Sequence, residues 1–228
     1  MSIIENYNAI RREIDDIAAA AGRNPGDIRI IAVCKTFPEA AIQEAIDGGI
    51  TLFGENKVQE AKRKMPALRG DYSFHMIGHL QSNKAREAVT LFDVIHSIDK
   101  LSTAEKVNDE AGRIGKRQKI LIQANISGEA TKSGIAAGEH IELARAISAL
   151  PHLDLLGLMT MAPYTDDENV IRSVFSGARN LLGEINAALG TSLRELSMGM
   201  SSDYPIAVAE GATMVRIGTA IFGERSYQ

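Results

Sequence analysis

The chain has 228 residues, 45% of them hydrophobic and 24% charged, a composition typical of a soluble globular protein with a sizeable core. Its net charge of −4 and its lack of a basic block argue against nucleic-acid binding, and no apolar run reaches the ~18 residues that span a bilayer. Cys34 is the single cysteine and the N-terminus lacks a signal-peptide core, so we expect a cytoplasmic protein without disulfides.

Apolar runs of strand length alternate with amphipathic helical stretches along the chain. An N-terminal helix is predicted over about 3–21. Strands are predicted at 28–34, 51–54, 73–78, 93–98, 118–126, 153–160, 194–199 and 212–218. The helices that follow them are predicted at 38–48, 56–65, 82–91, 100–114, 138–149, 167–189, near 202–210 and after Thr219.

Several residues supply signals for the starts of these helices. Pro38 stands at the first position of its helix, where its missing N–H costs no hydrogen bond. Ser82 is expected to cap helix 82–91. Thr165 and Glu168 are spaced as a capping box before helix 167–189.

Eight strand–helix units follow the N-terminal helix. Parallel strands need a crossover helix, and strands that are apolar throughout are expected when both faces of a sheet are covered. We therefore predict an α/β protein, a single (β/α)8 TIM barrel domain over 1–228 with an extra N-terminal helix. The alternative fold is an open doubly wound sheet.

Lys35 follows the first predicted strand on the same face as Ile31 and Val33. If that face points inward, Lys35 lies at the carboxyl end of the barrel, where active sites of this fold occur. Loss of hydration would lower its pKa and supply the neutral amine that forms a Schiff base with an aldehyde. The alternative is a lysine whose ammonium group reaches back to water.

Arg216 lies in the last predicted strand and shares a face with Met214 and Gly218. The first and eighth strands become neighbours when a barrel closes, so Arg216 and Lys35 would meet at one end. The alternative is a structural arginine paired with Glu210 or Glu224.

Two glycine- and hydroxyl-containing loops follow the last two strands, "GMSSD" at 199–203 and "GTAIFG" at 218–223. Phosphate sites of this fold are commonly built from these loops, with Gly218 allowing close approach and Ser201 and Thr219 offering hydroxyls. An amine, an arginine and a phosphate cradle together fit pyridoxal 5′-phosphate. Arg216 would then face the pyridine nitrogen as a permanent donor, which leaves the ring a weaker electron sink.

Other residues give weaker signals. The five histidines are scattered, without spacing typical of a metal site, and fingerprints of nucleotide-binding loops are absent. Cys34 is expected to be a core residue. Asn56 either caps a helix or contacts the cofactor, and Lys84 and Lys132 are either solvated or draw anions to the barrel mouth.

Several motifs together resemble the pyridoxal phosphate homeostasis protein family, which is similar to the N-terminal barrel of alanine racemase. They are "AVCKTFP", "FGENKVQEA", "FHMIGHLQSNKAR", "IQANISGEATKSGI", "GLMTMAP" and "LSMGMSSDYPIAVAEGATMVRIGTAIFG", from about 28 to 223. The resemblance implies the barrel of type III pyridoxal phosphate enzymes, with the following roles. It implies a Schiff base on Lys35, Arg216 at the pyridine nitrogen, Ser201, Gly218 and Thr219 at the phosphate, and Asn56 and Met198 beside the ring.

Three functions are open from the sequence. The family implies a non-enzymatic carrier active in vitamin B6 and amino-acid homeostasis, with apo enzymes as acceptors. An amino-acid racemase needs a second base, which alanine racemase takes from a separate C-terminal domain of its partner subunit. This chain ends soon after the last predicted strand, so we expect a monomer in which only Tyr164 and Tyr204 could substitute. The third function is a phosphate-binding barrel without pyridoxal phosphate.

Overall fold

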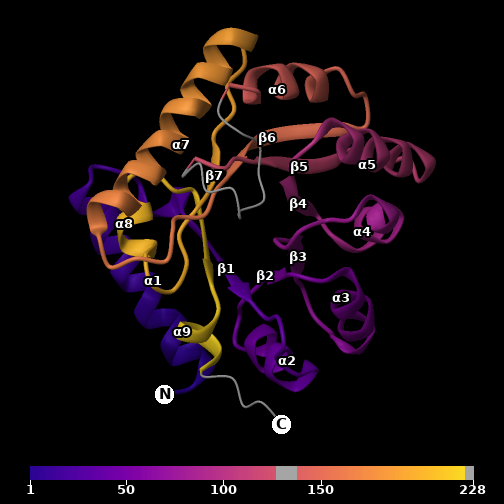
Figure 1. Cartoon of the computed structure of the whole chain (residues 1–228). Coiled ribbons are helices and arrows are strands. Elements are labelled where there is room, and N and C mark those ends of the chain that lie inside the picture. Colours follow the sequence, from indigo (N-terminus) through magenta and orange to yellow (C-terminus); the bar gives the residue numbers. More distant parts are fainter. Residues whose placement is uncertain (127–137, 224–228) are drawn as a thin grey trace.

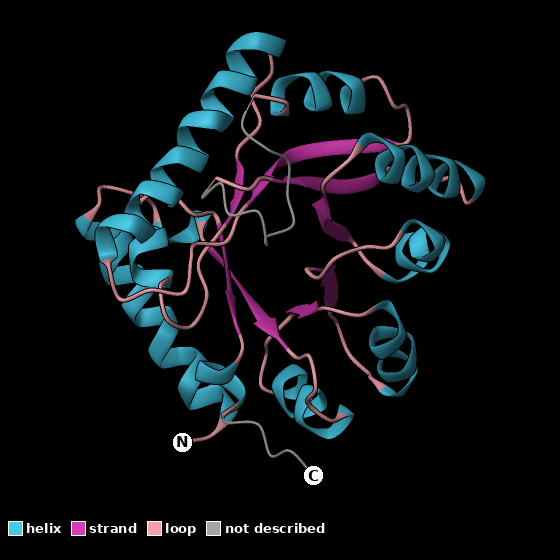
Figure 2. Ribbon diagram, in the orientation of Figure 1, coloured by secondary structure: helices cyan, strands magenta, loops and turns pink. Residues whose placement is uncertain are grey.

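The computed structural model describes residues 1–126 and 138–223 of the chain as a closed barrel of eight parallel strands ringed by helices (Figure 1; Figure 2). The strands are β1 (Arg29–Val33), β2 (Leu52–Glu55), β3 (Ser73–Met76), β4 (Val94–Ile98), β5 (Gln118–Gln123), β6 (Leu153–Met159), β7 (Glu195–Ser197) and β8 (Met214–Ile217). They pair in chain order, and β8 closes on β1. The predicted barrel is therefore confirmed, and the open sheet is excluded.

The helices on the outside of the barrel also follow the predicted order. They are α1 (Ile3–Ala20), α2 (Glu39–Asp47), α3 (Val58–Lys64), α4 (Ala85–Leu91), α5 (Leu101–Arg113), α6 (His140–Ser148), α7 (Glu168–Leu189), α8 (Tyr204–Ala209) and α9 (Thr219–Phe222). Three short 3-10 helices are η1 (Pro25–Asp27), η2 (Met65–Ala67) and η3 (Ser82–Lys84). The extra helix α1 runs beside the short α8 and α9 and covers the part of the barrel that they leave open (Figure 1).

Two hydrophobic layers hold the barrel together. The interior cluster consists of Ile31, Val94, Leu121, Met159 and Met214. The larger cluster fills the space between the strands and the helices and includes Ala32 and Val215. Because strand side chains alternate, the inward direction of Ile31 and Met214 places the faces of Lys35 and Arg216 inward, as predicted.

Three predicted helix starts are wrong. Pro38 is the N-cap of α2, which begins at Glu39, and so is not the first residue of that helix. Ser82 is the first residue of the 3-10 helix η3, and α4 begins only at Ala85, without a side-chain cap. The N–H of Ala85 already bonds to the carbonyl oxygen of Ser82 within the 3-10 turn. Helix α7 is capped by Asp167, whose carboxylate accepts from the Asn169 N–H at 2.9 Å, so the box of Thr165 with Glu168 does not form. The Thr165 hydroxyl instead accepts from the Asp167 N–H at 3.1 Å.

Candidate functional site

A cavity of about 330 Å³ opens at the carboxyl ends of the strands. It is lined by Val33, Lys35, Asn56, Ile77, Met161, Met200, Ser201, Ser202, Arg216, Gly218 and Thr219. Six of the seven residues predicted for the site line this one cavity, although they come from loops far apart in the sequence. The loops after β1, β2, β7 and β8 bring them together, because parallel strands place all their carboxyl ends on the same side.

Met198 is the predicted residue that does not line the cavity. Its side chain is fully buried in the hydrophobic layer between the barrel and the helices. Its neighbour Ser197, the last residue of β7, points into the barrel, where its hydroxyl bonds to Arg216 and His96, and the next residue, Met198, points outward into the larger cluster.

Lys35 is half-buried and stands two residues after the end of β1, with Cys34 between them. The next residue, Thr36, has a φ of 68° and is the one non-glycine residue of the described chain in the left-handed region. Lys84, which sequence reasoning placed near the mouth, does not line the cavity, and its ammonium lies 3.4 Å from a Glu87 carboxylate oxygen. Lys132 lies outside the described residues.

Arg216 is 5% exposed, and its guanidinium donates to the Ser197 hydroxyl at 2.7 Å and to the Thr160 carbonyl oxygen at 3.0 Å. The predicted alternative partner Glu210 is instead bound by Arg172 and Arg179 on α7. Burial lowers the pKa of Arg216 to about 10, so the group is still charged at neutral pH. The other alternative partner, Glu224, lies outside the described residues.

A chain of hydrogen bonds continues from Arg216 through the barrel interior. The Ser197 hydroxyl lies 2.9 Å from His96 Nδ1, and His96 Nε2 lies 2.9 Å from His75 Nδ1. Because a guanidinium only donates, the Ser197 hydroxyl accepts from Arg216. The directions of the two bonds that involve His96 follow from the tautomers of the two histidines.

Burial keeps both histidines of this hydrogen-bonded series, His75 and His96, neutral at pH 7. It holds the pKa of His96 well below its ordinary value and lowers that of His75 to about 4. Sequence reasoning took the histidines as scattered, because no short spacing connects these two residues or links either to Arg216. Only the closed barrel brings them together.

Two hydroxyls meet across the loops that follow β7 and β8. The Thr219 and Ser201 hydroxyl oxygens lie 3.5 Å apart at the edge of the cavity. An added Cβ at Gly218, between β8 and Thr219, would meet Val33 at 3.5 Å, an ordinary contact. Packing within the chain therefore tolerates a side chain at this position, and the glycine leaves that volume of the cavity open.

Neither candidate tyrosine lines this cavity. The Tyr204 hydroxyl donates to Glu13 on α1 at 2.6 Å, and burial together with this carboxylate raises its pKa. Tyr164 is fully exposed and borders a neighbouring cavity of about 270 Å³. Cys34 is buried in the outer core, and burial raises the pKa of its thiol, as expected for a packing residue.

Over 1–126 and 138–223, no three His, Cys, Asp or Glu side chains gather as metal ligands. Within the same ranges, every helix is too short or too polar to cross a bilayer.

A closed (β/α)8 barrel with a lysine after its first strand and an arginine in its last defines an alanine racemase-like barrel. The family model described as alanine racemase, N-terminal domain, matches residues 6–226. An alanine racemase of Clostridium difficile shares the fold alone, with a TM-score of 0.79 and 14% identity over 99% of this chain and 57% of that one.

The chain belongs to the pyridoxal phosphate homeostasis protein family. It is 44% identical to the Escherichia coli K12 pyridoxal phosphate homeostasis protein over 99% of this chain and 97% of that protein. The corresponding protein of Pseudomonas aeruginosa is 41% identical, with the same shares covered. PipY of Synechococcus elongatus with pyridoxal phosphate bound has a TM-score of 0.87 and 38% identity, over 97% of this chain and 100% of that one.

Proposed function

We propose that this protein binds pyridoxal 5′-phosphate in the cavity at the carboxyl end of the barrel and serves pyridoxal phosphate homeostasis in the cytoplasm. The observation that carries the proposal is the convergence of Lys35, Arg216 and the two hydroxyls of Ser201 and Thr219 on one cavity. The names of the relatives and the ligand in PipY support the same ligand here.

Lys35 is the proposed point of covalent attachment. A neutral amine adds to the aldehyde carbon, and loss of one water completes the Schiff base, so no oxidant or reductant is needed. Lys35 lines the cavity, whereas Lys57 and Lys84 do not. The loop position of Lys35 beside apolar Val33 and Ile77 supports its role.

The remaining residues of the cavity match the other parts of the ligand. Arg216 has N–H groups beyond those bound to Ser197 and Thr160, and we assign one to the pyridine nitrogen. Ser201, Gly218 and Thr219 are assigned to the phosphate, whose anionic oxygens accept from hydroxyl and backbone donors. Asn56 is assigned to the side of the ring.

The residues of the cavity favour a carrier over a racemase. When bound, pyridoxal phosphate supplies an electron sink that stabilises carbanions. The sink is weak when the residue at the pyridine nitrogen keeps its own proton and leaves that nitrogen unprotonated. Arg216 fits this description because it is charged at neutral pH. Racemisation also needs a second base, and the hydroxyl of Tyr204 is held by Glu13 on the outside of the barrel. We infer that the protein holds the cofactor and hands it to apo enzymes.

Covalent trapping tests the proposal. The protein is incubated with pyridoxal phosphate, scanned for the absorbance of an imine, reduced with borohydride and mapped by mass spectrometry. We expect the label on Lys35, its loss in Lys35→Ala and its retention in the matched control Lys84→Ala. A label that persists in Lys35→Ala contradicts the proposed attachment. Formation of D-isomer from single L-amino acids, above the level of Lys35→Ala, would contradict the carrier role.

A further inference from the structure

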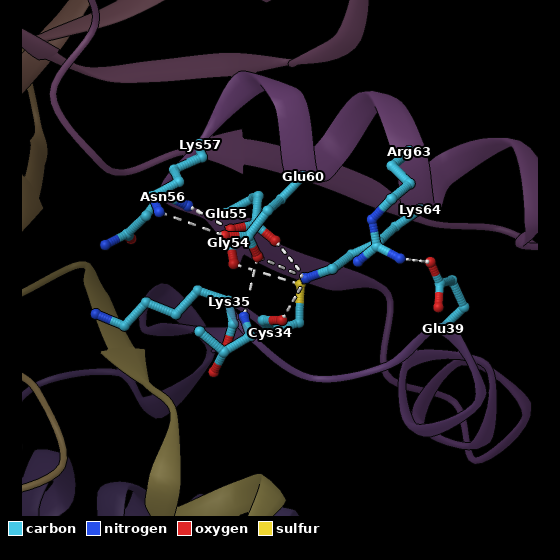
Figure 3. Close-up of polar contacts among 11 residues, drawn as sticks. Cys34, Lys35, Glu39, Gly54, Glu55, Asn56, Lys57, Glu60, Arg63 and Lys64 are labelled. Carbon is cyan, nitrogen blue, oxygen red and sulfur yellow. Dashed lines mark hydrogen bonds and ion pairs between the residues drawn. The ribbon is translucent and has the colours of Figure 1, made fainter. Parts of the chain in front are cut away.

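A buried ion cluster lies behind Lys35, on the side away from the cavity. The Lys64 side chain is completely buried, and its ammonium lies 2.8 Å from Glu55 and 3.1 Å from Glu60 (Figure 3). Its third acceptor is the carbonyl oxygen of Cys34 at 3.0 Å. An ammonium has three N–H donors, so all of them are used. Burial alone would lower the pKa of Lys64, but the hydrogen bonds and charges of Glu55 and Glu60 together raise it.

The cluster holds both peptide groups that adjoin Lys35. Lys64 binds the carbonyl oxygen of Cys34, and Glu60 Oε2 accepts from the N–H of Thr36 at 3.1 Å. Thr36 is in the left-handed region, a strained conformation for a β-branched residue that persists only where the surrounding structure holds it. The contact to Glu60 therefore fixes the turn by which the chain leaves β1.

The same cluster reaches a second residue of the cavity. The Glu55 carboxylate that binds Lys64 through Oε2 accepts from the N–H of Asn56 through Oε1 at 2.8 Å. Figure 3 shows the side chains of Lys35 and Asn56 extending to the same side, away from Lys64. Lys64 itself does not line the cavity. It can act on a ligand only through the residues whose backbone it anchors.

We propose that Lys64, Glu55 and Glu60 are positioning residues, which fix the backbone of Lys35 and Asn56 so that the Lys35 amine meets the aldehyde of the ligand. This inference rests on the proposed function. A reacting group displaced by about 1 Å can lose ~100-fold in rate. Loss of the contacts made by Glu60 should therefore slow the reaction of Lys35 with the ligand, while the melting temperature changes little.

The test separates the length of Glu60 from its charge. Glu60→Gln keeps the length and an acceptor oxygen, whereas Glu60→Asp keeps the charge but is one methylene too short to reach Thr36 and Lys64 together. Glu60→Ala loses both. The readouts are the rate constant of imine absorbance at saturating pyridoxal phosphate and the melting temperature without ligand. The control is Arg63→Ala on the same helix, which removes only the ion pair of Arg63 with Glu39.

We expect Glu60→Ala and Glu60→Asp to react about 10- to 100-fold more slowly than the unaltered chain. Glu60→Gln and Arg63→Ala should react within about twofold of it. If Glu60→Ala does not fold, the Asp and Gln variants decide. Slow reaction of Glu60→Gln with normal reaction of Glu60→Asp, or normal reaction of all folded variants, overturns the inference. Failure of the unaltered chain to react would count against the proposed function instead.

Discussion

Arg216 is a buried charge whose burial opposes folding. Over residues 1–126 and 138–223 it forms no ion pair with a carboxylate, and burial lowers its pKa from the ordinary value of an arginine to about 10. That shift corresponds to about 3 kcal/mol of unfavourable burial, which its hydrogen bonds to Ser197 and Thr160 offset only in part. The guanidinium is therefore a poor stabiliser of the ligand-free protein.

Arg216→Met should separate binding from stability. Removing an unpaired buried charge compensates for the lost hydrogen bonds, so we expect the free energy of unfolding without ligand to change by less than about 1 kcal/mol. Pyridoxal phosphate affinity should fall about tenfold or more, because a hydrogen bond from a charged donor is lost. Urea unfolding and equilibrium titration check the two parts. Arg172→Met, which removes a surface pair, should change neither. A drop of several kcal/mol with unaltered affinity would contradict the assignment.

The interior histidines predict a pH dependence of stability. His75 has a pKa of about 4 in the folded protein and about 6.5 when unfolded, so between these values the unfolded chain binds a proton that the native chain does not. Stability therefore falls as pH falls from about 6.5 to about 4, by up to roughly 3 kcal/mol for this group. His75→Gln should reduce proton uptake on unfolding by about one in this window. Urea melts at pH 7 and 5 measure it, with the exposed His79→Gln as control; equal slopes for His75→Gln and the unaltered chain would refute the prediction.

Lys64 shows why part of the site could not be predicted from the sequence. It stands in the run Lys62-Arg63-Lys64, and Lys62 and Arg63 are exposed on the helix surface, whereas Lys64 is completely buried. Residue type does not distinguish the three. What distinguishes Lys64 is the helical phase that turns it toward Glu55, and this phase depends on where α3 begins. Lys35 and Arg216 were predictable because a cation within an apolar strand pattern is unusual in itself.

At the scale of elements, the close approach of β2 and β3 depends on Gly78. A Cβ at this position would lie 2.2 Å from the carbonyl oxygen of Asn56, a backbone atom that cannot move without moving the loop. The glycine after β3 thus allows Asn56 to take its place beside the cavity. No other residue type fits here without displacing a residue of the candidate site.

Gly78→Ala should therefore weaken pyridoxal phosphate binding by shifting Asn56. We expect a loss of affinity together with a destabilisation of about 1–3 kcal/mol, as found for overpacking. Gly183→Ala is the matched control, because a Cβ on this glycine of helix α7 meets no atom within 4 Å. Helix propensity should make that variant about 0.5–1 kcal/mol more stable with the same affinity. Titration and thermal melts of both variants decide, and normal binding by Gly78→Ala would show that Asn56 is not needed where it lies.

The elements themselves were largely predictable, whereas their ends were not. The order of strands and helices follows from apolar periodicity, and this order stays the same when the predicted ends of the elements are wrong by a few residues. Helix ends depend on which of several nearby polar groups reaches a backbone N–H first. At α7 both Thr165 and Asp167 can cap, and Asp167 does so because it stands one residue before the helix. Ser82 does not cap α4, because it is the first residue of the 3-10 helix that precedes α4.

At the scale of the whole molecule, the candidate site lies on the seam where the barrel closes. Strand β7 has only three residues, and it pairs with β8 through Ser197 and Met214. Helix α1 reinforces this side, since Asn6 donates to the carbonyl of Ile221 at 3.0 Å. Closure could be predicted by counting strand–helix units, because eight such units are typical of a closed barrel. The hydrogen-bond chain through the interior could not, because its members are joined only by closure.

A ligand that contacts the loops after β1, β7 and β8 at once should stabilise the pairing of these strands where the barrel closes. At a free concentration of 100 times its dissociation constant, pyridoxal phosphate should raise the free energy of unfolding by about 2.7 kcal/mol. Hydrogen exchange of native-state amides should slow most in β1, β7 and β8 and least in β4 and β5, which lie across the barrel. Exchange with and without ligand, compared with Lys35→Ala, measures this pattern. Protection centred on β4 and β5 would place the ligand away from the seam, because a bound molecule slows opening first in the elements that it joins.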